Sequence, residues 1–121
     1  MTPSQEIRAQ RIIDQQVAMS GQTLERLRQV GLTGEKVLQI DFFFNAPTKK
    51  AAEALIEHLE KNDCLNLSAE KINGFFSPKF AVKGQTYPTN LTTKVLAKWL
   101  PWIIVQGILY NCEFDGWGAE V

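Results

Sequence analysis

Residues 36–44 read KVLQIDFFF, and this stretch decides the fold class. Apolar side chains occupy every second position of it: Leu38, Ile40, Phe42 and Phe44. Alternation with a period of two, rich in aromatic and β-branched residues, predicts a strand with one buried face. Phe43 then lies on the opposite face of the sheet, with Gln39 and Asp41.

The chain after this strand alternates between helical and extended patterns. In order, the patterns predict a helix, two strands, a long helix and a short strand, over residues 48–61, 65–72, 75–87, 91–110 and 112–114. Asn73-Gly74 is a hairpin signal, because both central residues of a type I′ turn need positive φ. Pro101 should kink or divide the long helix, since proline removes a helical hydrogen bond.

Two helices are predicted before the strand. Thr2-Pro3-Ser4-Gln5 fits a capping box with proline at the first helical position. Ala9, Ile13 and Val17 then form an apolar stripe, and Gly21 is expected to end the helix. A second, short helix is predicted over Thr23–Val30, with Gly31 closing it.

After these helices the order is strand, helix, strand, strand, helix, strand, which predicts an α+β fold with a ferredoxin-like β-α-β-β-α-β arrangement. We expect one domain over residues 1–121, with N-terminal helices in 1–31 and the ferredoxin-like core in 36–118. In that fold the sheet order is fourth, first, third, second. Cys64 and Cys112 would then lie on opposite sheet edges and should not form a disulfide.

Composition excludes several classes of function. The 13 basic and 13 acidic side chains cancel, so clustered positive charge gives no case for direct nucleic-acid binding. The first ten residues contain no apolar run typical of a signal peptide. The most apolar stretch, Leu100–Tyr110, is too short to span a membrane, which takes about 20 residues. We therefore expect a cytoplasmic protein with no membrane partner.

The closing segment Cys112–Gly118, with its tetrad Asp115-Gly116-Trp117-Gly118, resembles the end of RraB domains, bacterial inhibitors of ribonuclease E. The layout of Thr23–Leu59, a short helix, a Phe-rich strand and an alanine-rich helix, is also similar. The resemblance implies a non-catalytic regulator that binds ribonuclease E, lowers its activity, changes messenger RNA decay and needs no cofactor. Acidic relatives carry an acidic tail, whereas this chain has no net charge.

The residues themselves predict no catalytic, cofactor or metal site. His58, the only histidine, falls on the exposed side of its predicted helix, where we expect a solvated or capping role. Cys64 follows Asp63, whose charge should raise the pKa of the thiol. There is no Cys-x-x-Cys motif, histidine pair or glycine-rich phosphate loop. A small hydrolase that uses Cys64 or His58 remains the alternative from another class.

The segment Lys94–Tyr110 is apolar around more than one face and is therefore expected to be buried on more than one side. The N-terminal helices, a homodimer mate or a protein partner could cover it. Trp99 and Trp102 are candidate partner-binding anchors, because tryptophan is enriched at binding hot spots. Asp115 and Trp117 have two interpretations, a turn with a tryptophan packed over the sheet edge or an exposed partner contact.

Phe43 is one aromatic residue without a basic surround, which is a poor match to RNA binders that stack bases on a sheet. The sequence thus favours a protein-binding module with ribonuclease E as the target implied by the resemblance. The alternative is a module for another protein, such as an immunity or antitoxin protein.

Overall fold

The computed structural model describes residues 1–72 and 79–121. Its helices and strands are α1 (Pro3–Gln29), β1 (Val37–Leu38), β2 (Asp41–Ala46), α2 (Lys49–Lys61), β3 (Leu65–Ile72), β4 (Lys79–Gln85), β5 (Thr89–Asn90), α3 (Thr93–Leu109) and β6 (Glu113–Gly118). An antiparallel sheet has the order β3-β4-β2-β6, and β1 pairs with β5 in a small second sheet. The predicted α+β class is confirmed.

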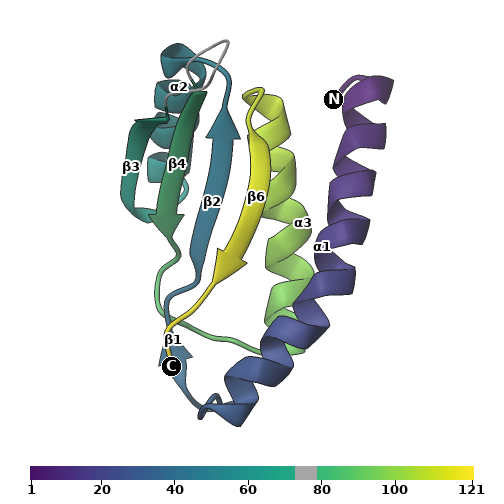
Figure 1. Cartoon of the computed structure of the whole chain (residues 1–121), viewed down its shortest axis with the longest axis vertical. Helices are drawn as coiled ribbons and strands as arrows, with labels where there is room; N and C mark the ends of the chain where they lie inside the picture. Colours follow the sequence, from purple (N-terminus) through teal and green to yellow (C-terminus); the bar gives the residue numbers. More distant parts are fainter. Residues whose placement is uncertain (73–78) are drawn as a thin grey trace.

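The helices form a layer on one side of the four-stranded sheet. Helix α2 packs on β3 and β4, while α3 packs on β6, and the long helix α1 runs beside α3 (Figure 1). The core lies between the sheet and these helices. Its largest fully buried side chains include Ile40, Phe42, Phe44, Leu55, Leu59, Leu100, Ile103 and Ile104.

The predicted burial pattern of the first strand is confirmed, but the strand is divided into β1 and β2. Phe42 and Phe44 are buried, whereas Phe43 is 41% exposed. The regular pairing with β4 stops near Ile40. There the N–H of Ile40 donates to Oγ1 of Thr86, and the N–H of Thr86 donates to the carbonyl of Ile40, both at 3.0 Å. Pro88 has no N–H to continue the ladder, so pairing resumes only between β1 and β5.

The prediction of two N-terminal helices is wrong, because α1 is continuous over 27 residues. The predicted capping box at Thr2 is present. Glycine in a helix interior costs about 1 kcal/mol relative to alanine, but continuing past Gly21 lets the helix bury Leu24 on the same face as Ser20. That burial offsets the cost. Val17, expected in the stripe, is exposed, and Ile12 is buried instead.

Helix α3 begins two residues later than predicted, with Thr92 as its N-cap. Pro101 does not divide it, and the helix continues to Leu109. The buried side of α3 faces the sheet and α1, so part of its excess apolar surface is covered within the chain. Trp102 and Leu109 stay exposed.

The last strand is longer than predicted and runs through the tetrad to Gly118. Phe44 pairs with Phe114 and Phe43 pairs with Gly116, so Asp115 is an extra residue in a β-bulge. Gly116 has a φ of 156° there, a conformation that favours glycine. The expected turn at Asp115-Gly116 is therefore a bulge inside the strand.

The predicted hairpin at Asn73-Gly74 and the start of the third strand, including Pro78, lie outside the described residues. Cys64 precedes β3 and Cys112 precedes β6, the two outer strands, and both thiols are free, as predicted. Across residues 1–72 and 79–121, no helix combines the length and apolar character that crossing a membrane requires.

Candidate functional site

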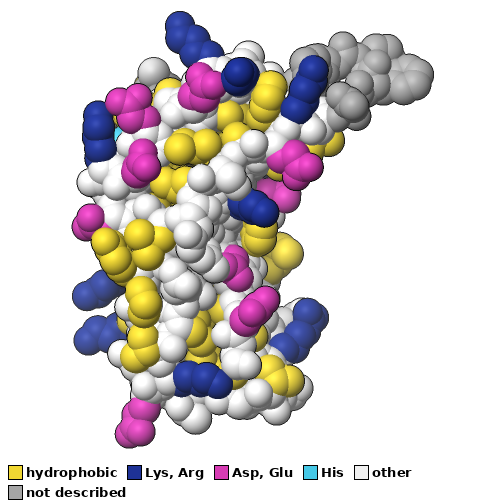
Figure 2. Space-filling model, turned by 90° about the vertical axis from the view of Figure 1, so that its left-hand side faces the viewer, with side chains coloured by type: hydrophobic (Ala, Val, Ile, Leu, Met, Phe, Trp, Pro, Cys, Tyr) yellow, Lys and Arg dark blue, Asp and Glu magenta, His cyan; other side chains and the backbone are white. Residues whose placement is uncertain are grey.

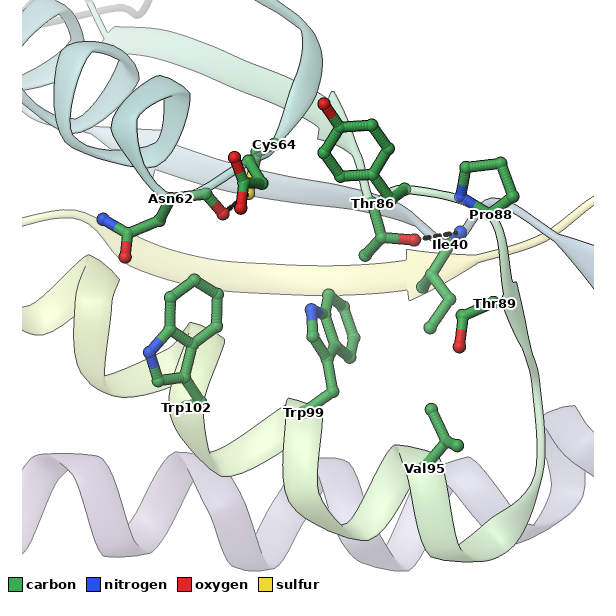
Figure 3. A pocket seen from close by; sticks show the side chains of 11 residues that line it. Ile40, Asn62, Cys64, Thr86, Pro88, Thr89, Val95, Trp99 and Trp102 are labelled. Carbon is green, nitrogen blue, oxygen red and sulfur yellow. Dashed lines mark hydrogen bonds between the residues drawn. The ribbon is translucent and has the colours of Figure 1, made fainter.

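A groove with a volume of about 350 Å³ opens beside α3, and we call it the tryptophan groove (Figure 3). Four segments form its walls: helix α3, the turn that directly follows α2, the connection from β4 to β5, and Ile40 between β1 and β2. Its lining residues are Ile40, Asn62, Asp63, Cys64, Thr86, Tyr87, Pro88, Thr89, Val95, Trp99 and Trp102.

Helix periodicity brings Val95, Trp99 and Trp102 to one side of α3, because residues three and four apart share a face. Both indoles project from α3 toward the segment that carries Asn62 and Cys64 (Figure 3). Trp99 is half-buried, with its ring 6.2 Å from that of Phe42. Trp102 is 36% exposed. The groove therefore has a fixed inner indole and an accessible outer one.

The opposite wall is the turn that ends α2. Asn62 is the C-cap, Asp63 has a φ of 65°, and the N–H of Cys64 donates to the carbonyl of Leu59 at 3.0 Å. Aspartate tolerates this left-handed conformation better than most residues. The turn therefore presents the Asp63 side chain to the groove.

The thiol of Cys64 is poorly suited to nucleophilic chemistry. Burial and the negative charge of Asp63 raise its pKa from 9.0 to about 11. The reactive form of cysteine is the thiolate, so the thiol stays protonated near neutral pH. The prediction that Asp63 raises the pKa of the Cys64 thiol is confirmed, although burial raises it more.

His58 has a different role from the solvated or capping one that we expected. Its Nε2 lies 2.6 Å from Oε1 of Gln106 on α3, and its ring centroid is 4.7 Å from that of Tyr110. The side chain is partly buried and connects α2 to α3. In the described part of the chain, no three His, Cys, Asp or Glu side chains are grouped closely enough to hold a metal ion.

The two predicted residues of the tetrad do not line the tryptophan groove. The indole N–H of Trp117 donates to Oγ of Ser20 at 3.0 Å, and the ring packs against the core. Asp115 is exposed at the bulge in β6. The structure thus brings Trp99 and Trp102 together and leaves Asp115 and Trp117 at separate positions.

The sequence interpretation missed Tyr87 and gave Asp63 no binding role. Tyr87 is 55% exposed and lines the groove between Thr86 and Pro88. A large aromatic residue at the end of the predicted strand 75–87, directly before the break that begins at Pro88, was the available signal. Nothing local indicated that this break faces α3, because that contact depends on the path of the chain from β4 to β5.

The sheet face opposite the helices carries a row of hydrogen-bonded polar side chains. Nδ2 of Asn66 donates to Oε1 of Gln85 at 2.6 Å, and Nε2 of Gln85 donates to Oδ1 of Asp41 at 2.7 Å. Phe43 pairs with Lys83 beside them. On the side that carries α2 and β3, acidic and basic side chains are scattered between small hydrophobic patches (Figure 2). This mixture differs from the basic stripe of a nucleic-acid binder.

Comparison with known proteins gives one family. The family model described as RraB, regulator of ribonuclease activity B, matches residues 18–119 of the 121. A search of curated proteins finds no match to this chain. The matched range includes the tryptophan groove, the later part of α1 and the whole four-stranded sheet.

Proposed function

The chain belongs to the RraB family, and from this membership we propose that it binds ribonuclease E and lowers its activity without catalysing a reaction itself. The family description supports a regulator of a ribonuclease. Ribonuclease E as the particular target, and the cytoplasm as the place of action, are parts of the proposal.

The observation that carries the proposal is the pair of indoles in the tryptophan groove. Trp102 is 36% exposed, and the half-buried Trp99 lies beside it along α3 and lines the same cavity. Tryptophan is enriched among the few residues that supply most of the binding energy of an interface. Asp115, an exposed carboxylate on β6 outside the groove, is a further proposed partner contact, and Trp117 is proposed to support the surface by holding β6 to α1.

The chemistry of the polar residues supports a non-catalytic role. A nucleophile pair needs a base within hydrogen-bond reach of a thiol that can ionise. Here the pKa of the Cys64 thiol is raised to about 11 by burial and by Asp63. His58, the one histidine of the sequence, contacts Gln106 and Tyr110.

We also infer that residues 1–121 form one domain with a ferredoxin-like core. The antiparallel order β3-β4-β2-β6, with α2 and α3 between the strands along the chain, supports this assignment. A shared hydrophobic core supports the single domain, because residues of α1, α2, α3 and the sheet belong to one cluster.

A second candidate is a binding module for another protein, of the immunity or antitoxin kind, or a homodimer through Lys94–Tyr110. The neutral charge favours this candidate if inhibition by relatives depends on their acidity. The test described next separates it from ribonuclease E inhibition.

The test measures ribonuclease E cleavage of a model RNA with and without the chain. We expect the unmodified chain to slow cleavage, and Trp102→Ala to weaken binding by about 2 kcal/mol, as for a hot-spot residue. Leu109→Ala is the matched control, because Leu109 is also exposed on α3 but does not line the groove. Far-UV circular dichroism checks that both variants fold. Failure of the unmodified chain to slow cleavage contradicts the proposal and leaves the second candidate.

A further inference from the structure

We propose that the tryptophan groove is a cation-binding cage that accepts an arginine side chain of the protein partner. The inference rests on the proposed function in that the arginine belongs to the bound protein. It adds the chemistry that the groove recognises. Three features of the groove carry it: the aromatic faces, the single charge and the end of α2.

The aromatic side chains come from two separate walls. Trp99 and Trp102 project from α3 (Figure 3). Tyr87 lines the same cavity from the connection between β4 and β5. The face of an aromatic ring carries partial negative charge and attracts a cation, and tryptophan does so most strongly. Aromatic residues on two sides of one cavity are the arrangement by which proteins recognise organic cations.

The charge of the groove has the matching sign. Among the described residues that line it, Asp63 is the only charged side chain, and it is acidic. Asn62, Asp63 and Cys64 directly follow α2, so the C-terminal end of this helix lies at the groove. The C-terminal end of a helix carries partial negative charge and favours a cation.

Arginine fits this set better than lysine. Its guanidinium group is planar and stacks on aromatic rings, and its N–H donors form a fork that matches a carboxylate. Stacking on the exposed ring of Trp102 and donation to Asp63 would use both properties at once. The volume of about 350 Å³ is near the lower end of small-ligand sites, which suits one long side chain.

The test uses N-acetyl-arginine amide as the ligand and N-acetyl-citrulline amide as the control. Citrulline has nearly the same shape but no charge. In nuclear magnetic resonance titrations, we expect the arginine amide to shift the indole N–H signals of Trp99 and Trp102. The signal of Trp117 should not move, because its indole N–H is hydrogen-bonded to Ser20, away from the groove. Equal binding of the citrulline amide, or no shift of either groove indole, would overturn the cage.

Single-residue variants then test whether Asp63 supplies the negative charge and Trp102 the aromatic ring that bind arginine. Asp63→Asn should weaken arginine binding about tenfold, the scale of one charge-assisted hydrogen bond, and asparagine tolerates the positive φ of this position. Asp14→Asn is the matched control, since Asp14 is exposed on α1 and does not line the groove. Trp102→Phe should retain most of the binding that Trp102→Ala loses. Unchanged binding in Asp63→Asn would also overturn the cage.

The ribonuclease assay separates the two proposals. Arginine binding with the predicted pattern but no effect on ribonuclease E would leave the cage standing and refute ribonuclease E as the target. Inhibition by Asp63→Asn equal to that of the unmodified chain would refute the cage as the partner site, while the proposed function would stand.

Discussion

The indole N–H of Trp117 donates a hydrogen bond to Oγ of Ser20 at 3.0 Å, across 97 positions of the sequence. Ser20 is 4% exposed, and its hydroxyl in turn donates to the carbonyl of Gln16 within α1. This bond connects the last strand to the first helix. It also explains why a polar residue is tolerated on the buried side of α1, since buried polar groups need partners.

The first prediction concerns this bond. Trp117→Phe should lower the free energy of unfolding by about 1 kcal/mol beyond the loss of ring contact, the usual net worth of a hydrogen bond. Urea unfolding of Trp117→Phe, Ser20→Ala and the double variant measures the coupling. Strictly additive effects would show that the bond contributes nothing.

The second prediction concerns the register of β2. Phe42→Asp should unfold the protein, because Phe42 is fully buried and an unpaired charge there costs several kcal/mol against a typical total of 5–15 kcal/mol. Phe43→Asp should be mild, since Phe43 is 41% exposed and pairs with Lys83. Circular dichroism and urea unfolding compare the two variants. Greater damage from Phe43→Asp would mean that the register is shifted by one residue.

The third prediction compares two glycines in helices. A Cβ at Gly107 would lie 2.9 Å from the carbonyl oxygen of Cys112 and would also meet the ring of Phe44. Gly107→Ala should therefore destabilise the protein by about 1–3 kcal/mol, the usual cost of overpacking.

Gly21 is the control position, because a Cβ there meets nothing within 4 Å. Gly21→Ala should stabilise the protein by up to about 1 kcal/mol, the helix preference of alanine over glycine. Thermal unfolding measures both variants. A loss of stability in Gly21→Ala would argue against one continuous α1.

The fourth prediction concerns the two thiols. Burial raises the pKa of Cys112 to about 11, and burial together with Asp63 does the same for Cys64. Both thiols should react slowly with a disulfide reagent in the folded protein at neutral pH, and both should be counted after denaturation without reductant. A count near zero would mean that they are oxidised.

The same shifts predict how stability depends on pH. The folded state keeps the thiols protonated to a higher pH than the unfolded chain, whose thiols ionise near 9.0. Their contribution to the free energy of unfolding is therefore fully present below pH 9 and is lost as the pH rises through about 11. A Cys64→Ala/Cys112→Ala variant should lose less stability over this interval. An equal loss of stability with rising pH in both proteins would contradict the raised pKa values of the two thiols.

Features that depend only on neighbouring residues can be predicted from the amino-acid sequence. The period of two in residues 36–44 established which phenylalanines are buried, because side chains alternate strictly along a strand. The capping box at Thr2 was equally local, since it uses only groups within the first helical turn. These features led to the α+β class and to the order of the main helices and strands.

Features that depend on distant contacts follow from the packing of the folded chain and have no local signal in the sequence. Gly21 is a helix stop by local preference, but the burial of Leu24 and the bond between Ser20 and Trp117 favour a continuous helix. The tryptophan groove likewise needs four segments that meet only in the folded chain. Local patterns describe which side of an element is apolar, whereas the free energy of packing determines what that side contacts.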